Sequence, residues 1–388
     1  MRTYQETHPW ITFQIDLRKA THKLWMLLGE AQSKCEYVAG VPLLPGVAEY
    51  LHQVFLAKGV LATTAIEGNT LTEEEVLRRL EGKLELPPSK QYLGQEIDNV
   101  VEACNLIANQ IFSGEPTILR VEDIQEYNRL VLKDLPLNED VIPGEFRKHS
   151  VVIGRYRGAP PEDCEYLLQR LCDWLNHNFN MPEEAKVAFG ILKAITAHIY
   201  IAWIHPFGDG NGRTARLIEF KILLSVGIPT TAAHLLSNHY NLTRSEYYRQ
   251  LDQAHRSGGD ILSFIEYALQ GFIDGLKEQI TIIKQQQLQV HWINYIHSKF
   301  RDKDSPANIR RRHLVIDLSA QDKPVLTSKI RHISPRIAEA YADKTDKTVM
   351  RDINHLMAMG LVEKSGKGVR ARPEIMVAFL PRTHSRDR

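Results

Sequence analysis

The residues from His205 to Arg216, near the middle of the chain, combine the side chains that phosphate chemistry needs. They read His-Pro-Phe-Gly-Asp-Gly-Asn-Gly-Arg-Thr-Ala-Arg, so one imidazole, one carboxylate and two guanidinium groups surround a glycine-rich turn. Glycines that alternate with polar residues ahead of a helix leave backbone N–H groups free to converge on an anion, and the helix dipole adds to the attraction. The stretch therefore predicts a phosphate cradle. It is not of the Walker type, because no Gly-Lys-Ser/Thr follows, and no strand-turn-helix pattern supports a dinucleotide fold.

Apolar residues recur at helical spacing on both sides of this stretch, over residues 185–204 before it and 217–224 after it. The turn therefore joins two helices. His198 lies two helical turns before His205, and we interpret it as a packed core histidine rather than a metal ligand. The same periodicity predicts further helices at 16–30, 47–61, 95–112, 121–132, 166–179 and 276–300.

The stretch from His205 to Arg216 resembles the signature of the Fic (Fic/Doc) family, His-Pro-Phe-x-Asp/Glu-Gly-Asn-Gly-Arg-x-x-Arg, at all nine specified positions. A second stretch resembles the inhibitory motif of that family, Ser/Thr-x-x-x-Glu-Gly/Asn, with Thr63, Glu67 and Gly68 at its specified places. The resemblance implies a mainly α-helical Fic-type core with a small β-hairpin flap. It also implies a protein adenylyltransferase, a nucleotidyltransferase that moves AMP from ATP to a Tyr, Thr or Ser hydroxyl of a target protein.

The resemblance also assigns roles to the residues of the signature. His205 is the general base, because a neutral imidazole can take the proton of the attacking hydroxyl. Asp209 holds Mg²⁺, whose remaining ligands come from ATP. The phosphate-binding residues are Gly210, Asn211, Gly212, Arg213 and Arg216, and the Asn211 side chain is expected to act as an additional donor.

Glu67 is expected to pair with Arg216 and so to hold the enzyme inactive. Arg216 is the guanidinium that the resemblance directs at the γ-phosphate, and it cannot serve a carboxylate and that phosphate together. The alternative is that Glu67 is a solvated carboxylate at a helix end.

Two further segments resemble parts of the family that contact the substrates. Tyr240, Tyr247 and Tyr248 lie where the family borders adenine, although tyrosines at helical spacing also fit simple packing. Residues 143–158 carry turn signals around the β-branched run Val151, Val152 and Ile153, which predicts a hairpin. In the family this hairpin is the flap on which a target protein docks by adding a strand, and the alternative is a hairpin that covers the core.

We divide the chain into an N-terminal helical region at 1–110 with the inhibitory motif at 63–68, a Fic core at 111–300, and a C-terminal domain at 301–388. The C-terminal domain resembles a winged helix-turn-helix, with 347–359 as recognition helix and 366–370 as wing tip. Residues 305–388 carry 17 Lys and Arg against 9 Asp and Glu, in a chain whose net charge is +1. This basic charge predicts DNA as a partner, and a protein-contact module is the alternative.

Other functions of the same residues stay open. The site could run in reverse and remove AMP from a modified target, or serve both reactions. The chain could also be a DNA-binding regulator with a nucleotide-sensing Fic core. The sequence is compatible with a homodimer.

The N-terminal residues and the hydropathy of the sequence predict a cytoplasmic protein that does not contact a membrane. The first ten residues are polar where a signal peptide would be apolar, and the sequence has no uncharged apolar run of 18 residues. The four cysteines show no Cys-x-x-Cys spacing and are expected to be buried and reduced.

Overall fold

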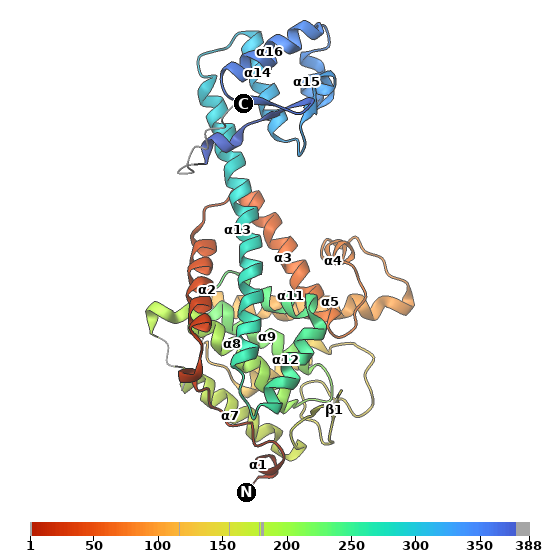
Figure 1. Cartoon of the computed structure of the whole chain (residues 1–388). Helices are drawn as coiled ribbons and strands as arrows, with labels where there is room; N and C mark the ends of the chain where they lie inside the picture. Colours follow the sequence, from red (N-terminus) through yellow and green to blue (C-terminus); the bar gives the residue numbers. More distant parts are fainter. Residues whose placement is uncertain (1, 116, 155, 178, 180–181, 378–388) are drawn as a thin grey trace. The chain divides into compact units, whose positions relative to one another are not determined.

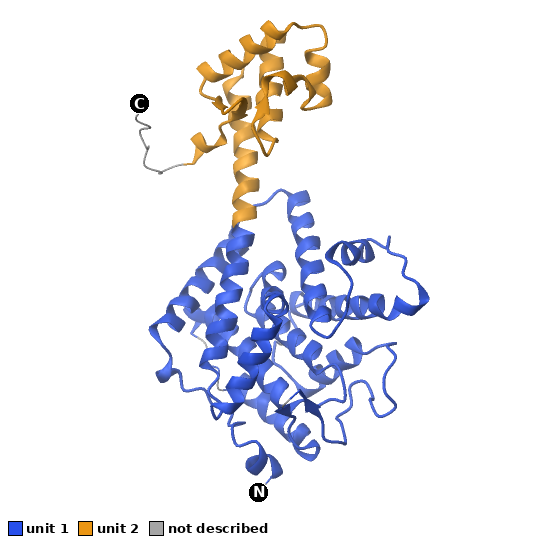
Figure 2. Cartoon of the chain, turned by 45° about the vertical axis from the view of Figure 1, so that its right-hand side comes forward, with its two compact units in different colours: residues 1–280 blue, residues 281–388 orange. Residues whose placement is uncertain are grey.

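The structure is a computed structural model that describes residues 2–377 except 116, 155, 178, 180 and 181. Residue 155 of the predicted flap and residues 378–388 of the predicted C-terminal domain therefore lie outside the described residues. The chain forms two compact units, residues 1–280 and 281–388 (Figure 2). The division falls inside helix α13 (Leu262–Lys299), whereas the sequence placed a boundary at its end.

The first unit is built from α-helices (Figure 1). In chain order its helices are α1 (Thr3–Thr7), α2 (His22–Gly40), α3 (Pro45–Ala65), α4 (Glu73–Leu80), α5 (Gln91–Phe112), α6 (Val121–Val131), α7 (Cys164–His177), α8 (Lys186–Ile204), α9 (Asn211–Ser225), α10 (Thr230–Ala233), α11 (Leu235–Leu242), α12 (Arg244–Arg256) and the first part of α13. Short 3-10 turns cover Leu17–Lys19, Pro88–Lys90, Pro161–Asp163 and Glu183–Ala185. The mainly α prediction is confirmed.

Helix boundaries differ most from the prediction at α2. The helix begins at His22 because the Thr21 hydroxyl accepts a hydrogen bond from the Leu24 N–H and caps it, so the predicted start at residue 16 was wrong. Helix α13 begins at Leu262, well before the predicted residue 276.

Helix α8 forms the centre of the first unit. It packs against α9, α7 and α2, and α9 in turn contacts α3, α5 and α6. Among the described residues, 183–204 form one segment long and apolar enough to cross a membrane, but 78% of its most apolar window is buried inside the fold. The burial of this segment is that of a core helix. The four cysteines are free and buried, as predicted.

The predicted hairpin is present as strands β1 (Val152–Ile153) and β2 (Tyr156–Arg157). The strands are antiparallel, and Val152 lies opposite Arg157. The Gly158 N–H donates to the Val151 carbonyl at 3.1 Å and extends the pairing by one residue.

The second unit has its own core around Trp292, Leu314, Ile353 and Val369. Its elements after α13 are α14 (Pro306–Ser319), β3 (Val325–Leu326), a 3-10 turn (Thr327–His332), α15 (Pro335–Ala340), α16 (Asp346–Ala358), β4 (Val362–Ser365), β5 (Gly368–Ala371) and a 3-10 turn (Pro373–Met376). The strands form an antiparallel sheet in the order β3-β5-β4. The predicted recognition helix at 347–359 corresponds to α16, and the predicted wing tip at 366–370 covers the turn between β4 and β5 and most of β5.

A buried carboxylate connects the helices of the second unit. Asp352 is fully buried and accepts hydrogen bonds from Arg310 Nε at 2.8 Å, Arg311 Nε at 2.7 Å and the Tyr341 hydroxyl at 3.1 Å. The network joins α14, α15 and α16, and removing the carboxylate leaves buried cations without a counter-charge.

We expect Asp352→Ala to lower the free energy of unfolding of the second unit by about 3–5 kcal/mol. Amide hydrogen exchange in α14 and α16 of the full chain measures this loss. Asp343→Ala is the control, because that exposed carboxylate pairs with its neighbour Lys344, which is half-buried, and should shift the same energy by under about 0.5 kcal/mol. Equal exchange in the two variants would contradict a structural role for Asp352.

Candidate active site

The predicted turn joins α8 to α9 through two left-handed residues. His205 ends α8 with φ of 49°, and its N–H still donates to the Ile201 carbonyl at 2.8 Å. Gly210 precedes α9 with φ of 75°. A left-handed histidine is a strained backbone position and persists only where the surroundings hold it.

Arg147 is the main support of this strained turn. Its Nε donates to the His205 carbonyl at 2.7 Å, its Nη1 donates to the His149 carbonyl at 2.6 Å, and its Nη2 donates to the Ala159 carbonyl. Its own N–H donates to the Pro206 carbonyl at 3.0 Å. Arg147 is buried, so its guanidinium ties the base of the flap to the backbone of His205. Sequence analysis missed this role, because Arg147 is recognisable there only as a charged residue at the start of the hairpin.

Two asparagines hold the rest of the turn. The Asn128 amide donates to the Asp209 carbonyl at 2.9 Å and accepts from the Gly144 N–H at 2.9 Å. The Asn211 side chain accepts from the Phe207 N–H and donates to the Phe207 carbonyl, both at 2.9 Å. The Asn211 amide therefore orders the loop, where the sequence analysis had expected it to donate to phosphates.

The first turn of α9 presents an anion site. The first backbone bond at the start of this helix runs from the Thr214 N–H to the Gly210 carbonyl at 2.9 Å. The N–H groups of Asn211, Gly212 and Arg213 precede that bond, at the positive end of the helix dipole. This is the cradle that the glycine spacing predicted.

Asp209 lies at the rim of the cradle with its side chain 53% exposed. One carboxylate oxygen accepts from the Gly210 N–H at 2.5 Å and lies 3.5 Å from Arg213 Nη2. The described residues contain no group of three or more His, Cys, Asp or Glu able to hold a metal ion by themselves. The donor set fits a hard cation that takes one carboxylate from the protein and its other ligands from a polyphosphate.

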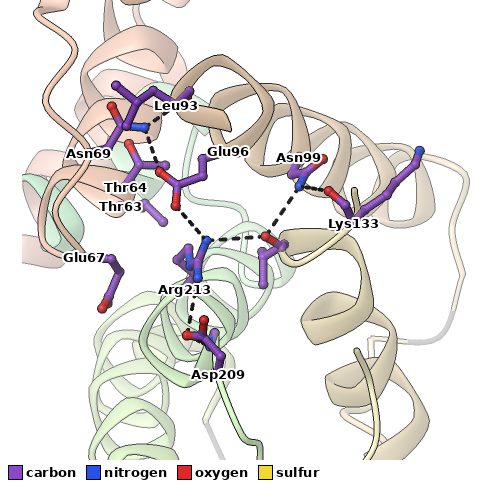
Figure 3. A network of polar contacts seen from close by, with 12 residues as sticks. Thr63, Thr64, Glu67, Asn69, Leu93, Glu96, Asn99, Lys133, Asp209 and Arg213 are labelled. Atoms are coloured by element: carbon purple, nitrogen blue, oxygen red, sulfur yellow. Dashed lines mark hydrogen bonds and ion pairs between the residues drawn. The ribbon is translucent and has the colours of Figure 1, made fainter. Parts of the chain in front are cut away.

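Arg213 is buried among acceptors (Figure 3). Its Nη1 lies 3.3 Å from Glu96 and 3.5 Å from the Val131 carbonyl. Glu96 also accepts from the Asn69 amide at 2.8 Å, and burial raises the pKa of the Glu96 carboxyl although Asn69 and Arg213 oppose that rise. Sequence analysis missed Glu96, an ordinary polar residue of α5 whose role depends on how α5 packs against α9.

Glu67 and Arg216 form the predicted ion pair. Arg216 Nη2 donates to Glu67 Oε1 at 2.6 Å and to the Thr63 carbonyl at 3.0 Å. Arg216 is buried, while the Glu67 side chain remains 33% exposed. Burial alone would raise the pKa of Glu67, but the charge and hydrogen bond of Arg216 hold it below its usual value.

The Glu67 carboxylate also lies directly over the cradle. A Cβ at Gly212 would stand 2.2 Å from Glu67 Oε1, so this oxygen is against the first turn of α9. Gly68, which ends the motif, has φ of 107°, a conformation that favours glycine. The inhibitory segment therefore places its own negative charge where the helix terminus attracts an anion.

A cavity of about 640 Å³ brings part of the predicted site together, but Asp209, Asn211 and Arg213 are not among the residues that line it. Its lining includes Glu67, Ile153, His205, Arg216 and Tyr247. Tyr248, Leu251, Gly212 and His198 also line it, as do residues to which sequence analysis gave no role: Ile66, Gly154, Tyr156, Ala202, Trp203, Ala215, Ser245, Arg249, Asp252 and His255. Another hollow, of about 810 Å³, is lined by residues 12–18 and by α7 and contains none of the predicted site residues.

The three predicted tyrosines occupy different positions. Tyr247 and Tyr248 line the cavity, whereas Tyr240 is fully buried and stacks on Tyr247 with ring centroids 4.8 Å apart. The Tyr247 hydroxyl lies 2.8 Å from His198 Nε2, and His198 Nδ1 lies 3.1 Å from Glu219. His198 is thus the buried core histidine that we predicted, and Tyr240 lies behind the cavity wall.

Residues 118–223, which include the whole turn, match the model of the Fic/DOC family. The chain contains a Fic/DOC domain. This domain contains Asn128, Arg147, His205, Arg213 and Arg216.

Named relatives and solved structures agree with this assignment. The chain is 31% identical over 208 residues to protein adenylyltransferase fic-1 of Caenorhabditis elegans, covering 54% of this chain and 38% of that protein. It is 31% identical over 206 residues to protein adenylyltransferase Fic of Nematostella vectensis, covering 53% and 44%. The matched region thus spans less than half the length of these relatives. A Fic family protein from Desulfovibrio desulfuricans superposes with a TM-score of 0.54 at 20% identity, covering 90% of this chain and 96% of that one.

The environment of His205 keeps its imidazole neutral. Burial and the nearby charge of Arg147 lower its pKa to about 4, against the opposing effects of a backbone hydrogen bond with Ala202 and of the carboxylates of Glu67 and Asp209. Because the pKa falls below its usual value near 6.5, the ring is neutral above about pH 4 and can accept a proton at physiological pH.

We expect the His205 imidazole to titrate with a midpoint near pH 4 in the full chain. NMR of histidine ring carbons, with the resonance assigned by its loss in His205→Gln, measures the midpoint. Glu67→Gln should lower it further, because a negative charge that favours the protonated ring is removed. A midpoint at pH 6 or above would contradict the burial of the ring.

Proposed function

We propose that this protein transfers AMP from ATP to a hydroxyl group of a target protein. One observation carries the proposal: the neutral imidazole of His205 and the guanidinium of Arg216 at the anion cradle line the same cavity. The names of the relatives, protein adenylyltransferases, support this choice of reaction.

The proposed reaction exchanges one phosphorus–oxygen bond for another. The target hydroxyl oxygen attacks the α-phosphorus of ATP, His205 takes the hydroxyl proton, and pyrophosphate leaves with the electron pair of the broken bond. The N–H groups of Gly212 and its neighbours and the guanidiniums of Arg213 and Arg216 stabilise the charge on the phosphate oxygens. Asp209 would hold Mg²⁺, which neutralises further phosphate charge when bound.

We infer that the protein as described is in its inhibited state. The Glu67 carboxylate occupies the guanidinium of Arg216 and lies against Gly212, so a γ-phosphate cannot reach either without displacing it. A hydrogen bond between charged groups is worth about 1.5–3 kcal/mol, which corresponds to about a ten- to hundredfold change in rate.

We expect Glu67→Gly to raise self-modification by about ten- to a hundredfold over the parent chain. ATP labelled at the α-phosphate should leave label on the protein, and ATP labelled at the γ-phosphate should not. The double variant Glu67→Gly/His205→Ala should lose AMP transfer but keep ATP binding. The double variant Glu67→Gly/Arg216→Ala should lose the increase in self-modification that Glu67→Gly causes alone.

The matched control for this experiment is Glu85→Gly, which removes an exposed loop carboxylate of the same unit and should leave the rate unchanged. Label from the γ-phosphate alone would indicate a kinase. A second incubation tests the reverse reaction: protein that already carries the α-label is freed of ATP and incubated in buffer with Mg²⁺. Loss of the label there would indicate that the site removes AMP instead.

We also propose that the second unit binds double-stranded DNA. Helix α16 presents Lys347, Arg351, Asn354 and His355 on its exposed side, and these side chains suit phosphate and base contacts. The tip of the β4-β5 hairpin adds exposed Lys364 and Lys367. Asp352 on the same helix is buried against arginines, so its charge does not face an approaching polyanion.

We expect the full chain to bind a random 30-base-pair duplex at low salt with an affinity that falls steeply as salt rises. Fluorescence anisotropy measures both quantities. Lys347→Ala with Arg351→Ala should weaken binding about tenfold and reduce the salt slope by about 2, because two phosphate contacts are lost. Lys19→Ala with Lys90→Ala removes the same charge from exposed positions of the first unit and should have little effect. Equal losses in the two pairs would place the interaction elsewhere.

A further inference from the structure

The first residues of the chain pack along the flap. We call residues 2–10 the N-terminal arm. Its start is anchored at Asp163, a buried carboxylate next to α7 that lies 3.1 Å from Arg2 Nη1 and accepts from the Tyr4 N–H at 2.8 Å. The Arg2 guanidinium also lies over the ring of Tyr166, 3.8 Å from its centroid. These contacts fix the path of the arm.

His8 connects the arm to the second strand of the flap. Its Nε2 lies 2.9 Å from the Arg157 carbonyl, and its Nδ1 lies 2.8 Å from the Thr7 hydroxyl. Because a carbonyl oxygen only accepts, Nε2 carries the proton of this hydrogen bond. His8 is buried, so this hydrogen bond is shielded from water.

The register of the hairpin shows which edge of the flap the arm covers. The bond between the Gly158 N–H and the Val151 carbonyl makes Val151 and Gly158 a hydrogen-bonded pair, so the next pair, Val152 and Arg157, is non-hydrogen-bonded. The backbone groups of these two residues therefore point outward, on opposite edges. His8 covers the edge at Arg157, while Val152 is 63% exposed.

Trp10 braces the side of the flap that faces the cavity. Its ring centroid lies 5.0 Å from that of His8, 6.3 Å from that of Tyr156 and 5.6 Å from that of His255. Tyr156 and His255 both line the cavity, and the Tyr156 hydroxyl donates to the Trp203 carbonyl at 2.7 Å, two residues before His205. The arm, the flap and the end of α8 thus form one packed assembly.

We propose that the N-terminal arm positions the flap and closes its β2 edge, so that an extended segment of the target protein pairs with Val152 on the β1 edge. His8 and Trp10 are the positioning residues. The identity of the β1 edge as the docking edge rests on the proposed function, because only that function calls for a target hydroxyl at His205. The bracing of the flap by the arm stands on the contacts alone.

Hydrogen exchange of the full chain, read in peptides covering residues 150–159, tests the bracing. His8→Ala and Trp10→Ala should each speed exchange of the flap amides by about tenfold or more, because a shielded hydrogen bond or an aromatic support is lost. His8→Gln keeps an N–H donor and should restore part of the protection. His22→Ala and Trp25→Ala, which change exposed residues of α2, are the matched controls and should leave the flap unchanged.

Flap exchange that is unchanged in both arm variants would overturn the proposal. A second readout is self-modification from α-labelled ATP in the Glu67→Gly background, where Trp10→Ala and Val152→Pro should each lower the rate at least fivefold without weakening ATP binding measured by calorimetry. A loosened flap with an unchanged labelling rate would also overturn the positioning role. An unlabelled Glu67→Gly reference would instead count against the proposed function, and the exchange result would still decide whether the arm braces the flap.

Discussion

The strained backbone at His205 is the constraint on which the site depends. Helix α8 must end abruptly, within the core, so that the imidazole turns into the cavity. Helix α9 can then start six residues after His205, with its N–H groups toward the same space. A left-handed histidine between two buried helices would relax without support. Arg147 on His205, Asn128 on Asp209 and Asn211 on Phe207 provide that support through backbone acceptors, and all three side chains are buried. The His205 imidazole is therefore positioned by these main-chain contacts of the turn, together with the hydrogen bond between its ring and the Ala202 backbone.

Both guanidinium groups of the site have carboxylate partners before any nucleotide arrives. Glu96 and Asp209 lie near Arg213, and Glu67 pairs with Arg216. Buried guanidinium groups need such partners, because an uncompensated charge in the interior is strongly destabilising. A triphosphate would replace one set of acceptors by another. The carboxylate partners of the two arginines differ in how firmly they are held. Glu96, the partner of Arg213, lies on α5 and is hydrogen-bonded to Asn69, whereas Glu67, the partner of Arg216, lies in the turn after α3.

Short-range patterns predicted the parts of the structure that local chemistry determines. The signature loop, the hairpin and the core helices follow from glycine spacing, residue types and apolar periodicity in neighbouring residues. The Glu67–Arg216 pair, which joins distant parts of the chain, was predicted from the family resemblance. Arg147, Glu96 and Asn128 could not be predicted, because each is an unremarkable polar residue whose role arises where distant helices meet. Tyr240 is a residue that the sequence pattern selected but that does not line the cavity. In α11 its hydroxyl donates to Glu219, and its ring stacks on Tyr247 behind the cavity wall. The error at the start of α2 has a local cause: Asp16 caps the short 3-10 turn Leu17–Lys19, and Thr21 caps the helix that follows it.

Asn69 lies immediately after the inhibitory motif and has a consequence for the energetics of the site. Its amide donates to Glu96 and to the Leu93 carbonyl, and its side-chain oxygen accepts from the Leu71 N–H, so the turn that carries Glu67 is fastened to the same carboxylate that faces Arg213. The two arginine–carboxylate pairs thus share one mechanical connection. By thermodynamic reciprocity, whatever free energy a nucleotide spends on displacing Glu67 reappears as a looser attachment of this turn, and an event at the surface of α3 or α5 that loosens the turn returns the same energy as nucleotide affinity.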